Sequence, residues 1–178
     1  FNDDINEIEL QIPLLQKICQ KDLFSISELP QNNIPQKIEN TRYKLLEDTQ
    51  MNSLVFSDKI YNQLNTLWPI CPDHLVFLGP KPYLYDNFED LLGSSNLAYQ
   101  PPLIFVKNNG IYIDQEVFTK IHFIQLQCFV DILLRLDRFD RIPVIPENEI
   151  KKLLNWDAEK YRQQMNQQTY TINSSFKK

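Results

Sequence analysis

Apolar residues at three- and four-residue intervals predict an amphipathic helix near the start of the chain, over residues 5–20. The positions at this spacing are Ile5, Ile8, Ile12, Leu15 and Cys19. Pro13 is expected to kink or delay the helix. A short extended piece over residues 23–26 follows, and Ser27 can cap a brief second helix that Pro30 limits.

A third helix is predicted after Pro35, where Ile38, Tyr43, Leu45 and Leu46 supply the apolar positions. The first part of the chain then reads helix, short strand, helix, helix. This is the order of elements in a winged-helix domain.

The middle of the chain mixes short apolar runs with prolines, so its elements are expected to be short. Residues 54–56 and 75–78 are predicted strands, and a helix is predicted near residues 59–67. Four prolines between residues 69 and 82 make this the most irregular region. The stretch GSSNLAYQPP, residues 93–102, is the best linker, and we place a domain boundary there, between residues 98 and 99.

The runs LIFV and IYID predict a β-hairpin around Asn108, Asn109 and Gly110, because these residue types accept the positive φ angles of a tight turn. A long helix is predicted next, from Asp114 as its N-cap to about Asp137. Its apolar residues cover more than one face, which is typical of a helix at the centre of a core.

Residues 142–145, IPVI, are β-branched and bounded by prolines, which favours an edge strand. A helix is predicted from Glu147 to about Trp156, and Asp157 can cap another over residues 158–168. The final TYTINSSF predicts a strand. The order helix, strand, helix, helix, strand therefore occurs a second time.

Together these elements predict an α+β fold, rich in helices, with two winged helix-turn-helix-like units in tandem. The first unit is expected over residues 1–98, with a long insertion, and the second over residues 99–178. The two halves lack obvious sequence similarity, so the repetition is one of layout.

Composition narrows the classes of function. The formal charge of −5 over 178 residues argues against a domain whose main work is to bind duplex phosphates, because that affinity comes from Lys and Arg. The three glycines lie too far apart for a phosphate-binding loop. Three widely spaced cysteines fit a reducing compartment, and no apolar run is long enough to cross a bilayer. The chain opens at Phe1 without a methionine, and its first residues are acidic and do not form a signal sequence, so we expect it to be part of a longer protein.

Candidate catalytic and metal-binding residues are few. His74 lies near Cys71, but a zinc site needs about four ligands and no second Cys/His pair exists, which favours an ordinary histidine in a turn. His122 has no nucleophile or carboxylate partner placed by the sequence, which favours a core histidine. Asp137 and Asp140 are flanked by arginines, as at a solvated helix end with local ion pairs. We expect no enzyme, no metal site and no cofactor.

The predicted helix over residues 158–168 lies where a winged helix would contact a major groove. Its amides could pair with adenine edges, but residues 142–178 carry only six basic against four acidic side chains. That balance is weak for a duplex binder, so contact with a protein is favoured. The candidate contact residues on this helix are Lys160, Arg162, Gln163, Gln164 and Gln167.

Tyr83 and Tyr85, in the turn-rich stretch PYLYDNF, are further candidates. Aromatic side chains on loops can anchor a protein interface or stack single-stranded bases. Packing of an irregular loop onto the core is the alternative interpretation.

The order of elements, the size of the chain and its richness in Gln and Asn resemble the C-terminal tandem winged-helix region of Stn-type subunits. These subunits belong to the Ctc-Stn-Ten complex and to its ciliate telomerase-holoenzyme counterpart. The resemblance covers residues 5–176 and includes no signature motif, so it assigns no functional residue. It implies an oligonucleotide-binding domain before this region, telomeric single-strand protection and support of complementary-strand synthesis by polymerase alpha-primase.

We therefore expect a non-catalytic docking module of a telomere maintenance complex in the nucleus. Its expected partners are protein subunits of a telomerase or polymerase alpha-primase assembly, with at most a weak contact to single-stranded DNA and no membrane contact. The alternative is a sequence-specific DNA-binding winged-helix domain of a transcription or replication factor, acting through residues 158–168. A third hypothesis, a small hydrolase, requires His74 or His122 to be essential for turnover.

Overall fold

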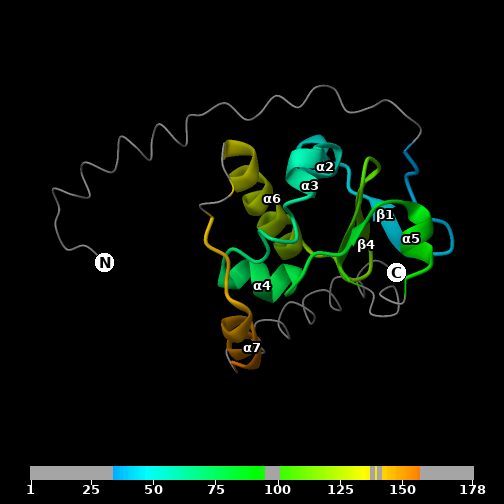
Figure 1. Cartoon of the computed structure of the whole chain (residues 1–178). Helices are drawn as coiled ribbons and strands as arrows, with labels where there is room; N and C mark the ends of the chain where they lie inside the picture. The colour runs from blue at the N-terminus through cyan, green and yellow to red at the C-terminus, as the bar shows by residue number, and fades with distance from the viewer. Residues whose placement is uncertain (1–33, 95–100, 137–138, 140–141, 157–178) are drawn as a thin grey trace, which may run out of the picture.

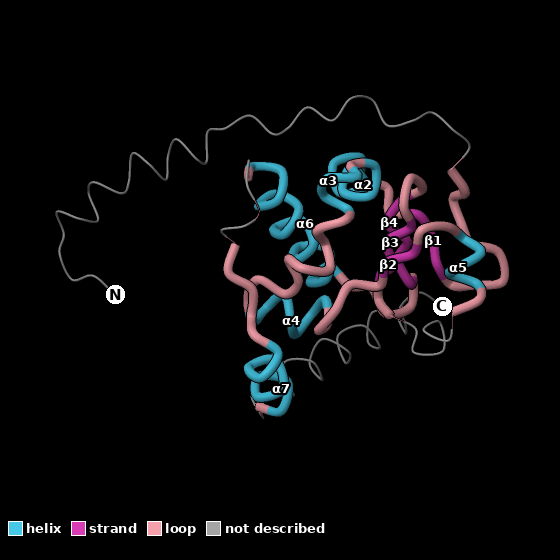
Figure 2. The backbone as a smooth tube through the Cα atoms, viewed as in Figure 1, coloured by secondary structure: helices cyan, strands magenta, loops and turns pink. Residues whose placement is uncertain are grey.

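The computed structural model describes residues 34–94, 101–136, 139 and 142–156. They form an α+β fold in which helices flank a four-stranded sheet (Figure 1, Figure 2). The strands are β1 (Tyr43–Leu45), β2 (Leu84–Tyr85), β3 (Leu103–Val106) and β4 (Gly110–Asp114). The helices are α2 (Thr49–Phe56), α3 (Asp58–Tyr61), α4 (Pro72–Leu78), α5 (Phe88–Leu92), α6 (Lys120–Arg135) and α7 (Glu147–Asn155).

The strands lie in the order β1-β4-β3-β2. β4 is antiparallel to both β1 and β3, whereas β2 runs parallel to β3. The predicted hairpin is confirmed as β3 and β4. Asn108 has a φ of 55° and Gly110 a φ of 153°, in the positive range that Asn and Gly tolerate better than other residues.

Side chains of β3 alternate between two apolar cores, one on each face of the sheet. Leu103 and Phe105 join the larger core together with residues of α2, α4 and α6. Ile104 and Val106 join the smaller core together with Leu91 of α5. Figure 2 shows α2, α4 and α6 on one side of the strands and α5 on the other. β3 is therefore apolar at every position because both of its faces are buried.

Two short apolar runs that were predicted as strands are helical. Residues 54–56 belong to α2, whose N-cap Asp48 accepts a backbone hydrogen bond of 2.8 Å. Residues 75–78 belong to α4, where Cys71 is the N-cap and Pro72 stands in the first turn. Both predictions were wrong because a short apolar run suits a buried strand as well as a buried helix, and the residues before it decide.

The helix predicted after Pro35 is also wrong. The chain bends at Asn40, which has a φ of 57°, and then forms β1. β1 pairs with β4 from a distant part of the sequence. Its apolar side chains are therefore fixed by a non-local partner, which local periodicity does not reveal. The helix predicted over residues 59–67 is shorter than expected, since α3 ends at Tyr61 and turns follow.

The long helix predicted after the hairpin is confirmed as α6, although it begins at Lys120. Asp114 ends β4 and does not cap the helix. At 16 residues α6 is the longest described helix. None of the helices in the described residues is long and apolar enough to cross a membrane.

α7 confirms the helix predicted from Glu147, but residues 142–145 form no strand. Ile145 instead donates its N–H to the carbonyl of Pro69 at 2.9 Å, which holds this stretch beside the turn before α4. Three predicted features lie wholly or mostly outside the described residues: the elements over 5–30, those over 158–176, and the linker over 93–102.

One sheet extends across the boundary predicted between residues 98 and 99. β1 and β2 come from the predicted first unit, β3 and β4 come from the second, and the larger core draws on both. In the part of the chain that the structure describes, the two predicted units thus share a sheet and a core. The α+β class is confirmed at this level.

Candidate protein-binding surface

A tightly bonded turn connects the sheet to α6. Asp114 is 0% exposed, and its carboxylate accepts a hydrogen bond of 2.6 Å from Nη2 of Arg42. The same carboxylate accepts the Glu116 N–H at 2.9 Å. The Phe118 N–H donates to the Asp114 carbonyl at 2.9 Å. These bonds tie the start of the α6 segment to β1 and β4, so they fix the direction in which the helix leaves the sheet.

A histidine closes the first turn of α6. The N-cap residue Thr119 donates its backbone N–H to Nδ1 of His122 at 2.9 Å, and its hydroxyl lies 2.8 Å from the same nitrogen. Burial lowers the pKa of His122 to about 4, so the ring is neutral near pH 7 and Nδ1 can accept a hydrogen bond. This bonding supports a capping role for His122.

The inner face of α6 packs into the larger core, against α4 and α2. Its buried members, each at most 2% exposed, are Leu126, Phe129, Val130, Leu133 and Leu134. Gln50 of α2 donates a hydrogen bond of 2.7 Å to the Asp131 carboxylate of α6. These contacts hold α6 against α2 and α4, so the opposite side of the helix keeps one orientation relative to the core.

The opposite side of α6 carries a second line of apolar side chains. It consists of Ile121, Ile124, Cys128 and Ile132, with Val117 just before the helix, and we call it the α6 outer face. The three isoleucines are 38%, 42% and 40% exposed, and Cys128 is also exposed. Steps of three or four residues place them along one side, because a helix turns once every 3.6 residues. A helix that is apolar on two opposite sides is expected to be covered on both.

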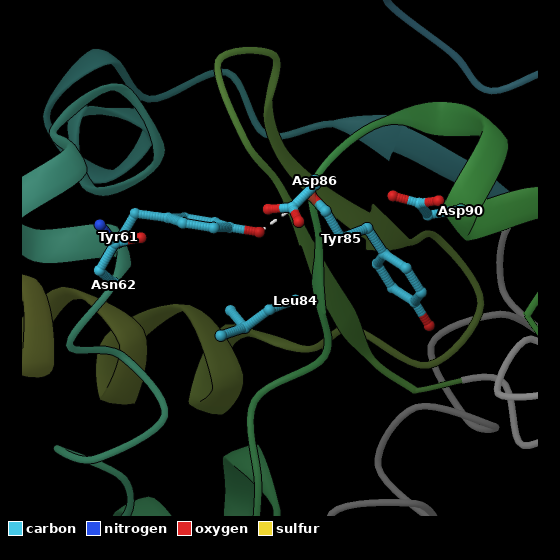
Figure 3. A pocket seen from close by; sticks show the side chains of 6 residues that line it. All are labelled: Tyr61, Asn62, Leu84, Tyr85, Asp86 and Asp90. Atoms are coloured by element: carbon cyan, nitrogen blue, oxygen red, sulfur yellow. Dashed lines mark hydrogen bonds between the residues drawn. The ribbon is translucent and has the colours of Figure 1, made fainter.

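An open hollow of about 330 Å³ lies beside β2 and the end of α3 (Figure 3). It is lined by Tyr61, Asn62, Leu84, Tyr85, Asp86 and Asp90. The Tyr61 hydroxyl donates to the Tyr85 carbonyl at 2.9 Å. Burial, with a further contribution from Asp86, raises the pKa of Tyr61 to about 12. The hollow therefore presents a neutral phenol that is already hydrogen-bonded and two solvated carboxylates.

The two tyrosines predicted as contact residues lie at β2, and their environments differ. Tyr85 is 6% exposed, belongs to the smaller core, and its ring is turned away from Tyr61 (Figure 3). Tyr83 is half-buried against the same core, and Nζ of Lys81 lies 5.6 Å from the centre of its ring. The packing interpretation thus describes Tyr85, while Tyr83 keeps an accessible edge.

His74 lies in a buried helix and not in a turn. It is 1% exposed, and its ring centre lies 4.0 Å from that of Trp68 and 4.6 Å from that of Phe129. Among the described residues its Nε2 finds no hydrogen-bond partner, and burial lowers the pKa of His74 to about 3. Cys71 is occupied as the N-cap of α4, where Sγ accepts the His74 N–H at 3.4 Å. No three His, Cys, Asp or Glu residues within the described ranges gather as metal ligands.

The contact residues predicted on the helix over residues 158–168 lie outside the described residues. These are Lys160, Arg162, Gln163, Gln164 and Gln167. Asp137 and Asp140 lie outside them as well.

Many described cations are already paired with carboxylates. Those in ion pairs are Arg42, Lys44, Lys107, Arg135, Lys151 and Lys152. A paired cation neutralises a phosphate less effectively than a free one, because it must first leave its partner. The weak case for duplex binding that the net charge makes stays a prediction.

The apolar positions of the α6 outer face are visible in the sequence, but their pattern predicts a helix with core around it. The apolar excess between residues 117 and 133 suggested a helix surrounded by core, whereas the structure buries only one side.

Comparisons of the chain with models of protein families, with characterised proteins and with solved structures give no match.

Proposed function

We propose that this protein is a non-catalytic docking module that binds an amphipathic helix of a protein partner on the α6 outer face. The observation that carries the proposal is the line of exposed apolar side chains on a helix whose other side is fixed in the core. From Ile121 to Ile132 this line is about 16 Å long at 1.5 Å per residue, which three turns of a partner helix would match.

From the resemblance to Stn-type subunits, we propose that the protein acts in a telomere maintenance complex in the nucleus. Its partner would then be a protein subunit of a telomerase or polymerase alpha-primase assembly. A winged-helix unit toward the C-terminus is also part of the proposal, with α7 and the helix predicted over residues 158–168 as its helix-turn-helix. The negative net charge and the paired cations support a protein partner over duplex DNA.

A binding experiment with a matched control tests the proposal. Ile124→Glu places a charge at the centre of the α6 outer face, whereas Leu92→Glu makes the same chemical change at α5, where Leu92 is 59% exposed. We expect the full chain to capture a purified telomerase or primase subunit, and Ile124→Glu to weaken capture about tenfold or more, as at a central interface residue. Leu92→Glu should bind like the wild type.

If both variants bind equally well, the α6 outer face is not the binding surface. If the chain captures none of these subunits, it does not belong to a telomerase or primase assembly. Fluorescence anisotropy with duplex DNA at two salt concentrations tests the alternative function. Tight binding with a steep dependence on salt would favour the DNA-binding domain instead.

A further inference from the structure

The sheet has one edge that no described strand covers. On the side of β1, the chain itself closes the edge, because Lys37 forms a bridge with Lys44. The Leu45 N–H also donates to the Gln36 carbonyl at 2.9 Å. On the opposite side β2 is the last strand in the order, and among the described strands it pairs only with β3. An edge strand left open in this way is a template to which an extended chain can pair.

The backbone groups that this open edge presents belong to Leu84. The Tyr83 carbonyl accepts the Phe105 N–H at 2.9 Å, and the Tyr85 carbonyl accepts the Lys107 N–H at the same distance. The backbone groups of both tyrosines therefore point toward β3. Since successive residues of a strand direct their N–H and C=O groups to opposite sides, those of Leu84 point away from β3. No described residue bonds to them, so they can pair with a second chain.

The hollow of about 330 Å³ lies along the same edge. Its lining comes from both faces of the sheet. Tyr61 belongs to the larger core on one face, Asp90 belongs to α5 on the other face, and Leu84 of β2 lies between them. A space that is bounded by an edge strand and by elements on both faces lies over that edge. A chain that pairs with Leu84 therefore places side chains in the hollow.

The hollow is acidic. The described residues that line it include two carboxylates, Asp86 and Asp90, and no cation. Figure 3 shows Asp86 between Tyr61 and Asp90. Within the described ranges neither carboxylate forms an ion pair, and Lys107 bonds to Asp58 instead, at 2.8 Å. A cationic side chain on the added strand would therefore meet two carboxylates that no described cation neutralises by direct contact.

We propose that the edge of β2 binds an extended segment of a protein partner, and that an arginine of this segment enters the hollow. The backbone of the segment pairs with Leu84, and the guanidinium donates to Asp86 and Asp90. Arginine suits this site better than lysine, because its planar group carries five N–H donors in a fixed fork and can bond to two carboxylates at once. No α6 residue is among the described residues that line the hollow, so this contact is separate from the α6 outer face and does not depend on it.

Two matched peptides and the full chain test the charge. The probe is a fluorescein-labelled peptide of alternating Val and Thr around one central Arg, and its control carries citrulline, which keeps the shape of Arg and loses its charge. Fluorescence anisotropy should show that the Arg peptide binds about tenfold more tightly than the citrulline peptide. Asp86→Asn combined with Asp90→Asn should remove this preference. Glu89→Gln, which removes a charge from α5 at a residue that does not line the hollow, should keep it.

A further variant tests the backbone pairing. Leu84→Pro removes the N–H that points away from the sheet and leaves the groups that pair with β3 in place, as a proline on an edge strand does. We expect it to weaken the binding of both peptides by about three- to tenfold, as for a lost hydrogen bond. Methylation of the backbone nitrogens of the Arg peptide removes the donors on the other side, so it should weaken binding as well. This arm leaves the protein unchanged and decides the question if Leu84→Pro does not fold.

Several results would overturn the proposal. They are no binding of the Arg peptide up to about 1 mM, equal affinity for the two peptides, or a preference that survives Asp86→Asn with Asp90→Asn. Binding that backbone methylation does not weaken would overturn the strand pairing. Ile124→Glu on the α6 outer face should bind both peptides like the wild type. Loss of peptide binding in that variant would place the peptide on α6, whereas unchanged binding supports the β2 edge whether or not the docking function holds.

Discussion

At the scale of single residues, both histidines of the chain are buried, and this makes folding sensitive to acid. Burial lowers the pKa of His74 to about 3 and that of His122 to about 4. Between about pH 6.5 and pH 4 the unfolded chain, whose histidine pKa values are near 6.5, therefore binds more protons than the folded chain. The stability that the neutral rings provide is complete above pH 6.5 and is lost as the pH falls toward the folded values.

His74→Phe tests this linkage at one site. A phenyl ring fits the contacts with Trp68 and Phe129, and it cannot take up a proton. Each neutral buried histidine makes the free energy of unfolding fall by about 1.4 kcal/mol per pH unit below pH 6. We therefore expect the stability of His74→Phe, relative to the wild type, to rise by about that amount for each unit between pH 6 and pH 4.

Urea unfolding at pH 7, 6, 5 and 4 measures the difference directly. Titration of carboxylates contributes to both proteins, so it cancels when the two curves are subtracted. Parallel curves for wild type and variant would mean that His74 takes up a proton in the folded protein as readily as in the unfolded one.

At the scale of elements, the junction of β1, β4 and α2 depends on a glycine and an asparagine. Asn52 of α2 is buried, donates to the carbonyls of Leu46 and Asp48 at 2.7 and 2.8 Å, and accepts the N–H of Ile111 at 2.7 Å. Gly110, beside Ile111, lies directly under this side chain. Its position allows the backbone of β4 to approach α2 closely.

Gly110→Ala should therefore destabilise the protein by about 2 kcal/mol or more. An added Cβ would meet Leu45 and would lie 3.2 Å from Oδ1 of Asn52, on a residue whose φ of 153° disfavours any side chain. Gly93→Ala is the matched control, because Gly93 has a φ of −76° and its Cβ would have its nearest contact, with a backbone oxygen, at 3.4 Å.

Thermal unfolding of both variants measures the effect. The control should change the free energy of unfolding by about 0.5 kcal/mol or less, since its backbone conformation suits alanine. Similar melting temperatures for the two variants would contradict the close packing of β4 on α2.

The same elements show what the sequence can predict. The hairpin was predictable because Asn108 and Gly110 act on neighbouring residues, and α6 because its apolar pattern is long. α2 and α4 were not predicted, although Asp48 and the Cys71–Pro72 pair mark their starts, because a short apolar run suits a buried strand as well as a buried helix. β1 was missed because its partner, β4, is distant in sequence. The α6 outer face was missed because periodicity shows which side chains are apolar and not which of them a neighbour covers.

At the scale of the whole molecule, the sheet couples the two halves of the chain. β1 and β2 occupy the two edges, and the hairpin of β3 and β4 lies between them. The edge strands have two and three residues, so neither could pair stably without the hairpin. Without residues 1–98, the hairpin would lose one neighbouring strand on each side, and its larger core would lose α2 and α4.

We therefore predict that residues 1–98 and 99–178, produced separately, do not fold independently. The first half lacks both strands with which β1 and β2 pair, and the second half keeps the pair of β3 and β4 but loses β1 and β2. The first half keeps α2 and α4 but loses α6, the helix against which both pack. Because a core divided in this way exposes most of its apolar surface, circular dichroism of either half should show no cooperative thermal transition. An equimolar mixture of the two halves can recover a cooperative transition if the halves associate, and the intact chain should unfold its described region in one step.

A cooperative transition in each separate half would contradict this prediction. It would support two separate units that meet between residues 98 and 99, and it would contradict the shared sheet.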